Sequence, residues 1–334
     1  MSRALVTGAS GFVGSHLVES LVRAGDVVRC LVRPTSDTSL LDTLDVETVV
    51  GDISTTSNWS NALRNIDTVY HVAALTRALS SRELLSVNAR GTALLAKACA
   101  AKPSPPKLVV VSSLSAGGTS GRPGSSGSAA LGKPVSNYGR SKRAAELAAA
   151  RWASEVPTTI VRPGVVFGPR DRDTAPLFAA IKTLGIHVIP GFNWSPVAVI
   201  DVRDLVEMIR LAAFEGKTIG PLADGPGIYD AADPLTIHYA ELGRIIGRAV
   251  RRPDVLMMHC PVPLLMTAAS CAEFVARLRR CQTTFNLDKM RDATAGSWIG
   301  DTSRTQSELG FRPLVDFEQR VYDTARWYES AGWL

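Results

Sequence analysis

Ser113, Tyr138 and Lys142 carry the side-chain types that proton transfer to or from a carbonyl oxygen would use. Tyr138 and Lys142 stand four positions apart at the start of an alanine-rich segment, so a helix there places both side chains on one face. An ammonium group beside a phenol stabilises the phenolate, which lowers the pKa of the tyrosine and makes it a usable proton donor and acceptor. Ser113 follows 108–111, an apolar run that predicts a strand buried on both faces. Because a tyrosine and a lysine at this spacing are also common on surfaces, the interpretation depends on the elements that position them.

The first of these elements is a glycine-rich turn near the N-terminus. A short apolar run over 4–6 predicts a strand, and apolar residues at helical spacing from 12 to 22 predict a helix. Between them, Gly8 lets the chain turn sharply, Gly11 leaves room for phosphates, and Gly14 lets the helix approach the sheet. The pattern predicts a site for the pyrophosphate of a dinucleotide, with a first gap one residue longer than in the Gly-x-Gly-x-x-Gly fingerprint.

The end of the second predicted strand, 27–32, indicates which dinucleotide to expect. An acid at this point would hold the adenosine ribose hydroxyls, whereas an arginine favours a 2′-phosphate, and the strand ends in Arg33. We therefore predict NADP(H) over NAD(H), with Arg33 as a plain surface charge as the alternative. Asp52 follows the third strand, 47–50, where we expect it near the adenine; the alternative is a turn aspartate.

The order of the elements predicts an α/β fold, a Rossmann-type doubly wound parallel sheet with a smaller C-terminal substrate-binding lobe. A fourth strand over 67–71 is followed by the small residues Ala73 and Ala74, and a long helix spans 82–101. We expect 1–165 to form the dinucleotide-binding domain, with 196–215 returning to it, and 166–195 and 216–334 to form mainly the lobe. The Gly/Ser-rich segment 117–132 is either a lid over the pocket or an idle surface loop.

Composition excludes several classes of protein. The 334 residues carry a net charge of +6 with scattered Lys and Arg, so a nucleic-acid site is not expected. The five cysteines have no metal or redox spacing, and His71 is expected to be packed rather than to bind a metal. No apolar run reaches ~18 residues, and the chain enters a strand at once, so we expect neither a transmembrane segment nor a signal peptide, and a cytoplasmic location.

The motifs in their order resemble the extended short-chain dehydrogenase/reductases, also called the NAD-dependent epimerase/dehydratase family. The likeness covers nearly the whole chain, and its quoted pieces are Thr7 to Gly14, Gly51-Asp52, His71 to Ala74, Asn88 to Thr92, Ser112-Ser113, Tyr138 to Lys142, Arg162-Pro163 with Gly168-Pro169, Val202 to Leu205, Trp298 to Asp301, Glu308 to Pro313 and Trp327-Tyr328. The Gly-x-x-Gly-x-x-Gly spacing is the form that accompanies a Ser, Tyr, Lys site in this family.

The resemblance implies a role for each matching residue. Tyr138 would be the catalytic acid/base, Lys142 would hold the nicotinamide ribose and tune Tyr138, and Ser113 would hydrogen-bond the reacting oxygen. It also implies a homodimer formed through the helices after the fourth and fifth strands. The residues expected to contact or support the cofactor are Gly8, Ser10, Gly11, Phe12, Val13, Gly14, Arg33, Asp52, Ile53, Ala73, Ala74, Asn88, Lys142 and Pro163.

Departures from the family pattern bear on the substrate. The Thr-Asp-Glu triplet of sugar dehydratases is absent, and no asparagine follows shortly after Arg162-Pro163. The sequence looks more like the dihydroflavonol-reductase and 3β-hydroxysteroid-dehydrogenase branches, which favours an NADP(H)-dependent oxidoreductase acting on a fairly apolar carbonyl or alcohol. The alternatives are a nucleotide-sugar epimerase or dehydratase with tightly bound NAD and, outside enzymes, a dinucleotide-sensing scaffold. The apolar stretch 255–269 is interpreted as lobe core in preference to the wall of an apolar pocket.

Overall fold

The computed structural model describes residues 1–55, 58–119, 132–191, 196–223, 225–279, 281–296 and 298–334. Its main feature is a parallel sheet of seven strands in the order β11-β6-β5-β4-β1-β2-β3. These strands are β1 (Arg3–Thr7), β2 (Val27–Val32), β3 (Val46–Val50), β4 (Thr68–His71), β5 (Lys107–Val111), β6 (Thr158–Pro163) and β11 (Ile228–Ala231). The strand order reverses between β1 and β4, which is the point where open α/β sheets bind ligands. The predicted doubly wound fold is confirmed.

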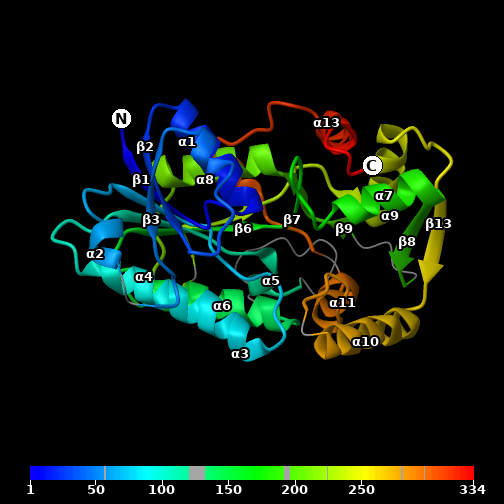
Figure 1. The fold of residues 1–334 in the computed structure, drawn as a ribbon, viewed down its shortest axis with the longest axis horizontal. Coiled ribbons are helices and arrows are strands. Elements are labelled where there is room, and N and C mark those ends of the chain that lie inside the picture. Colours follow the sequence, from blue (N-terminus) through cyan, green and yellow to red (C-terminus); the bar gives the residue numbers. More distant parts are fainter. Residues whose placement is uncertain (56–57, 120–131, 192–195, 224, 280, 297) are drawn as a thin grey trace.

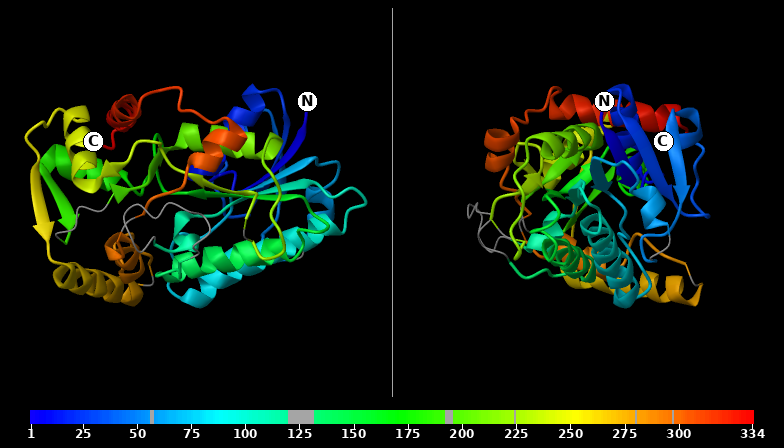
Figure 2. Two further views of the ribbon diagram at one scale, coloured as in Figure 1. Left: turned by 180° about the vertical axis from the view of Figure 1, so that it is seen from behind. Right: turned by 90° about the vertical axis from the view of Figure 1, so that its left-hand side faces the viewer.

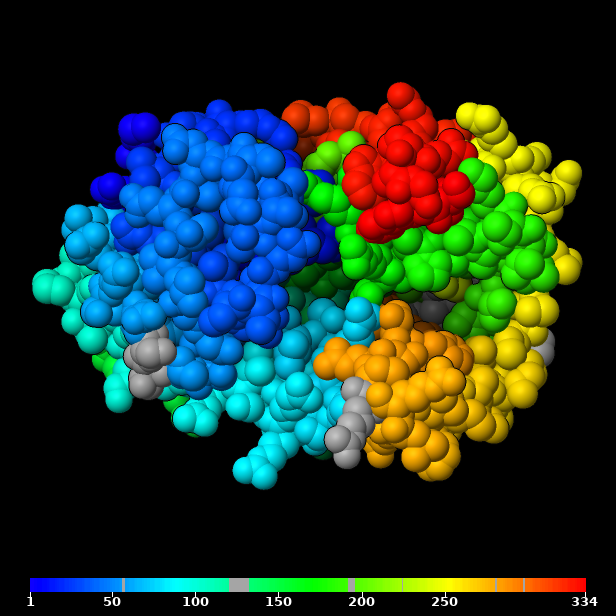
Figure 3. Space-filling view, in the orientation of Figure 1, coloured from blue at the N-terminus to red at the C-terminus, as the bar shows by residue number. Residues whose placement is uncertain are grey.

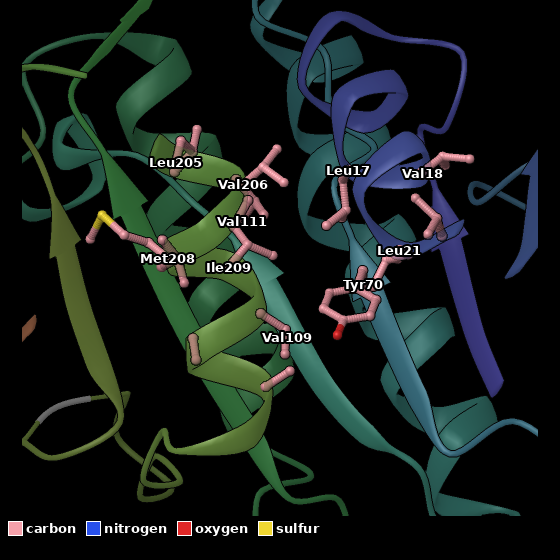
Figure 4. Close-up of a cluster of buried hydrophobic side chains, with 14 of the residues drawn as sticks. Leu17, Val18, Leu21, Tyr70, Val109, Val111, Leu205, Val206, Met208 and Ile209 are labelled. Atoms are coloured by element: carbon pink, nitrogen blue, oxygen red, sulfur yellow. The ribbon is translucent and has the colours of Figure 1, made fainter. Parts of the chain in front are cut away.

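Helices cover both faces of the sheet because its central strands are apolar on both sides (Figures 1 and 2). On one face, α1 (Phe12–Arg23) and α8 (Val202–Phe214) pack their apolar stripes onto the strands, as the side chains of Leu17, Val109 and Leu205 show in Figure 4. On the other face lie α4 (Gly91–Ala100) and α6 (Asn137–Ala150). Asp201 accepts a hydrogen bond from the backbone N–H of Arg203 and caps α8.

The helix expected over 82–101 forms in three joined parts. These are α3 (Ser81–Leu84), a widened turn η2 (Leu85–Arg90) and α4. Asn88 lies in the widened turn, and its buried side chain points into the protein rather than along a regular helix face.

The lobe contains α7 (Ala175–Leu184), α9 (Tyr239–Ala249), α10 (Val262–Leu278), α11 (Leu287–Thr294) and α13 (Phe317–Ser330), and a helix α12 (Ser303–Leu309) lies beside β11. The described residues also form three short strand pairs: β7 (Val165–Phe167) with β10 (Val199–Asp201), β9 (Pro196–Val197) with β12 (Ile237–His238), and β8 (Ile186–Pro190) with β13 (Leu256–Cys260). The β8–β13 pair lies at the edge of the lobe away from the large sheet (Figure 1). Short helical pieces η1 (Leu41–Thr43), α2 (Trp59–Ala62) and α5 (Leu114–Gly117) complete the described elements. None of the helices in the described ranges has the length and hydropathy to cross a bilayer.

Within the range 216–334, which is expected to form mainly the lobe, one strand belongs to the sheet: β11 pairs with β6 in register Ile228 to Ile160 and extends the large sheet. One expectation for the second half needs correction. The stretch 255–269 is not lobe core, because Leu256, Met258 and Leu264 are 61, 43 and 60% exposed. The chain forms β13 and then α10 there, and both elements lie at the edge of the lobe, so each has only one face to bury (Figure 1).

Candidate active site

A cleft of about 1870 Å³ lies between the carboxyl ends of the sheet strands and the lobe, and Figure 3 shows it as a recess between the blue and the green and orange residues. Its volume accommodates a dinucleotide together with a small substrate. Ser113, Tyr138 and Lys142 line this cleft, and so does every residue predicted to contact the cofactor except Asn88. No group of three His, Cys, Asp or Glu side chains within the described ranges could hold a metal ion.

The glycine turn has the close approaches that its spacing predicts. Gly8 has φ of +75°, and a Cβ atom on it would lie 2.7 Å from the backbone nitrogen of Ala73. A Cβ atom on Gly14 would collide with the carbonyl oxygen of Gly8. Among the described residues no side chain caps the N-terminus of α1, so its first N–H groups face the cleft as donors for an anion. A pyrophosphate fits this cradle.

Arg33 and Asp52 line the cleft close to each other. Arg33 is exposed, and its charge is among the causes that lower the pKa of Asp52; the largest cause is a hydrogen bond from the backbone N–H of Ser54. Ser54 donates through both its N–H and its hydroxyl to Asp52 Oδ1, at 2.7 Å each. Asp52 therefore stabilises a turn, as the alternative interpretation expects, and it also lines the cleft.

Ser113, Tyr138 and Lys142 converge from two elements. Ser113 follows β5 and accepts a hydrogen bond from the backbone N–H of Ser115 at 3.2 Å. Tyr138 and Lys142 lie on the first two turns of α6, where Ser136 caps the helix through the N–H of Gly139. The buried Lys142 donates from Nζ to the carbonyl oxygen of Val111 at 2.7 Å, which fixes its side chain beside the end of β5.

The pKa of Tyr138 differs from the sequence expectation. Burial raises it to about 12, the hydrogen-bonding Ser113 side chain lowers it, and the charges of Asp292 and Asp173 raise it further. Burial also lowers the pKa of Lys142 to about 8. Lys142 therefore does not hold the phenol near neutral pH in this structure, because desolvation of Tyr138 outweighs any stabilisation of the phenolate.

A buried ion pair supports the end of β5 from behind. Glu146 of α6 is fully buried and accepts two hydrogen bonds of 2.7 Å from Arg162 and one of 2.6 Å from the hydroxyl of Ser112. Burial raises the pKa of Glu146, but the Arg162 guanidinium more than offsets it, so the carboxylate stays charged. The pair ties β5, β6 and α6 together directly behind Ser113.

Asn88 and His71 support the site without lining the cleft. Asn88 accepts from the backbone N–H of Leu75 at 2.8 Å and donates to the hydroxyl of Ser141 at 2.9 Å, so it joins the loop after β4 to α6. These contacts fit the expectation that Asn88 supports the site, and its role toward the cofactor stays a prediction. His71 is packed, as expected, and its two ring nitrogens hydrogen-bond the hydroxyls of Thr7 and Thr92.

Two acidic residues of α11 contact the N-terminal end of α6 and were not identified from the sequence. Asp288 accepts from the backbone N–H groups of Asn137 and Tyr138 at 2.7 and 2.9 Å. Asp292 accepts from the hydroxyls of Ser136 and Ser115 at 3.0 and 3.2 Å. Their partners lie 150 to 177 positions away in the chain, so no local pattern marks them. The only sequence signal was a pair of acids one helical turn apart.

The question whether the Gly/Ser-rich segment is a lid or a surface loop falls largely on residues that the structure does not describe. Most of the Gly/Ser-rich segment 117–132, namely 120–131, lies outside the described residues.

Comparison with known proteins agrees with this geometry. Residues 4–221 match the NAD dependent epimerase/dehydratase family. A ceramide reductase of Caulobacter vibrioides is 28% identical, over 98% of this chain and 95% of that protein. A bovine decarboxylating sterol-4-alpha-carboxylate 3-dehydrogenase is 27% identical, over 97% of this chain and 92% of that protein. The expected family, with its steroid-dehydrogenase-like branch, is confirmed.

One solved structure with the same fold is that of a sugar-nucleotide dehydratase. The dTDP-glucose 4,6-dehydratase of Bacillus anthracis in complex with NAD has a TM-score of 0.77, with 18% identity over 100% of this chain and 98% of that one. At this identity the likeness is one of fold alone.

Proposed function

Because the chain belongs to the NAD-dependent epimerase/dehydratase family, we propose that it is an NADP(H)-dependent reductase of a carbonyl group on a fairly apolar substrate. The observation that carries the proposal is the convergence of Ser113, Tyr138 and Lys142 in one cleft with the glycine turn. A scaffold that only senses a dinucleotide has no need for all three side chains.

The lobe side of the cleft supports an apolar substrate. Its lining there includes the apolar side chains of Val165, Leu177, Leu242, Val262, Leu287, Met290 and Trp298. Charged side chains line the same side, and Asp173 pairs with Arg77 and Lys289. The apolar walls would bind the apolar part of a substrate, and the polar groups would orient it. The reductase and sterol-dehydrogenase names of two relatives support the same class of substrate.

Each polar residue of the site has a role in carbonyl reduction. When bound, the reduced nicotinamide supplies the hydride that forms the new C–H bond. Tyr138 donates its phenolic proton to the carbonyl oxygen, and Ser113 donates a hydrogen bond that stabilises the developing charge on that oxygen. Lys142, whose Nζ donates to the Val111 carbonyl oxygen, would bind the ribose hydroxyls and return a proton toward Tyr138.

The protonation state of Tyr138 suits donation of a proton to a carbonyl oxygen. With a pKa raised to about 12, the phenol is protonated at neutral pH and ready to donate. Alcohol oxidation would need the phenolate at the start of the reaction, and burial disfavours that form.

Arg33 supports the preference for NADP(H). It is an exposed cation at the end of β2 that lines the cleft next to Asp52, where a 2′-phosphate of the adenosine ribose would lie. A homodimer and a cytoplasmic location stay predictions.

The test compares Tyr138→Phe with the matched control Tyr322→Phe, since Tyr322 lies on α13 and is not among the cleft-lining residues. Ketones, sterols and sugar nucleotides are assayed by NADPH oxidation. We expect Tyr138→Phe to lose roughly 10²-fold or more in kcat, the usual contribution of a general acid, with almost unchanged NADPH affinity. Full activity of Tyr138→Phe would refute the catalytic assignment. Turnover of a sugar nucleotide without net NADPH consumption would favour the epimerase alternative.

A further inference from the structure

The hydroxyls of Ser113 and Tyr138 come from two separate segments of the chain, so their separation depends on what holds these segments together. Ser113 is the N-cap residue of α5, and Tyr138 lies in the first turn of α6. A Cβ atom on Gly139 would lie 2.5 Å from the carbonyl oxygen of Ser115, so the first turn of α6 packs directly on the backbone of α5. Two hydroxyls that act on one substrate oxygen therefore depend on the contact between α5 and α6.

Asp292 of the lobe helix α11 bridges these two segments, and Figure 1 shows α11 beside α5. Its Oδ2 atom accepts from the hydroxyl of Ser115 at 3.2 Å and from the hydroxyl of Ser136 at 3.0 Å. Ser115 donates its backbone N–H to the hydroxyl oxygen of Ser113 at 3.2 Å, and Ser136 caps α6 by accepting from the N–H of Gly139 at 2.9 Å. One carboxylate oxygen is thus linked through one serine to each of the two segments.

The carboxylate of Asp292 has no other use in the described part of the chain. No cation there pairs with it, since Lys289 pairs with Asp173 at 2.9 Å and Arg291 lies 3.8 Å from Asp288. Its Oδ1 atom is buried and has no hydrogen-bond partner among the described residues. No residue of α11 is fully buried, so no apolar anchor of its own fixes this helix. The two serine contacts are therefore what Asp292 contributes.

We propose that Asp292 is a positioning residue that holds the hydroxyls of Ser113 and Tyr138 at the separation that carbonyl reduction requires. The inference rests on the proposed function, because the separation matters for a reaction in which both hydroxyls meet one oxygen. The Asp292 charge also raises the pKa of Tyr138, but positioning needs only the Oδ2 acceptor. An asparagine offers an oxygen acceptor without the charge, so it separates the two effects.

The experiment compares Asp292→Ala with Asp292→Asn. Both variants remove the charge, but only the asparagine keeps an oxygen that can accept from both serine hydroxyls. We expect Asp292→Ala to lose roughly tenfold or more in kcat, because a small displacement of reacting groups is costly in rate. We expect Asp292→Asn to keep a kcat within about threefold of the wild type, since a neutral acceptor still positions the two hydroxyls. NADPH affinity and thermal unfolding close to those of the wild type show that both variants are folded.

Ser115→Ala tests the path of the effect. It removes one of the two contacts and leaves α11 unchanged, so it should lower kcat less than Asp292→Ala does. Added to Asp292→Ala, it should change kcat by less than about twofold, because the contact is already lost. Independent losses that multiply in the double variant would overturn the proposal.

The ¹³Cζ resonance of Tyr138, assigned with Tyr138→Phe, reports on the phenol without any substrate. It should differ between Asp292→Ala and Asp292→Asn, because these variants share the loss of charge and differ in the serine contacts. The matched control is Asp301→Ala, which removes the acceptor of the Ser303 hydroxyl away from the cleft lining and should leave kcat and the Tyr138 resonance unchanged.

Equal kcat losses in Asp292→Ala and Asp292→Asn would overturn the proposal, and so would identical Tyr138 resonances in the two variants. If the wild type turns over no carbonyl substrate, the proposed reaction fails, and the resonances alone decide whether Asp292 positions Tyr138.

Discussion

Removing the carboxylate of Asp288 tests whether the lobe positions Tyr138, the proposed proton donor. Asp288 belongs to α11 in the lobe, yet it accepts the backbone N–H groups of Asn137 and Tyr138 at 2.7 and 2.9 Å. These groups are in the first turn of α6, where a helix has donors without internal partners and a positive dipole end. The carboxylate therefore fixes the backbone of the residue that carries the reactive phenol.

The size of the effect follows from these contacts. Hydrogen bonds to a charged group contribute about 1.5 to 3 kcal/mol when buried, but the Asp288 side chain is 23% exposed and Ser136 already caps α6. We therefore expect Asp288→Ala to lower the free energy of unfolding by about 2 kcal/mol, within the range of helix-cap losses. A small displacement of a reacting group costs more in rate than in stability, so kcat should fall roughly tenfold or more while NADPH affinity is retained.

The matched control is Asp316→Ala. Asp316 caps α13 by accepting from the backbone N–H of Glu318 at 2.8 Å, and it is not among the cleft-lining residues. The variant Asp316→Ala therefore loses a helix cap without any change at α6. Besides kcat, ¹³Cζ-tyrosine NMR reports on the site without any substrate, because the chain has six tyrosines and Tyr138→Phe assigns the relevant resonance. The Tyr138 resonance should shift in Asp288→Ala and stay in place in Asp316→Ala. Equal kcat losses in the two variants, or an unmoved Tyr138 resonance, would refute positioning by Asp288.

Three further outcomes follow from the charges in and behind the cleft. Arg33→Ala should weaken NADPH binding by roughly 10- to 100-fold and leave NADH binding nearly unchanged, since a charge-assisted contact to phosphate is lost. Calorimetric titration measures both dissociation constants. An unchanged ratio of the NADPH and NADH dissociation constants would contradict the NADP(H) assignment. Asp292→Asn should lower the pKa of Tyr138 by on the order of half a unit, because the Asp292 charge raises it, and the same tyrosine resonance reports it. Burial lowers the pKa of His71 to about 3. The contribution of its neutral ring to the free energy of unfolding is therefore fully present above the ordinary pKa of 6.5, and it is lost as the pH falls from 6.5 toward 3. Between pH 6.5 and 5, the free energy of unfolding of the wild type, measured in urea, should fall by about 2 kcal/mol more than that of His71→Gln, at about 1.4 kcal/mol per pH unit. Parallel pH profiles of the two free energies would count against this.

The sequence alone determined the fold class and most of the cofactor site, because both depend on local patterns. Gly8, Gly11 and Gly14 sit between a strand and a helix, and such a turn needs glycine wherever it occurs. Ser113 follows β5 and Tyr138 lies in the first turn of α6, so their positions could be predicted from the chain, whereas their proposed roles come from the family resemblance.

Only the tertiary structure decided the features that depend on contacts between distant segments. Asp288 and Asp292 reach α6 from about 150 positions away, and nothing near them in the sequence names their partners. The raised pKa of Tyr138 comes first from burial, which a local Tyr-Lys spacing does not report. The stretch 255–269 has the composition of a core, but whether an apolar helix is covered depends on what the fold leaves beside it, and at the edge of this lobe one face of α10 is left open.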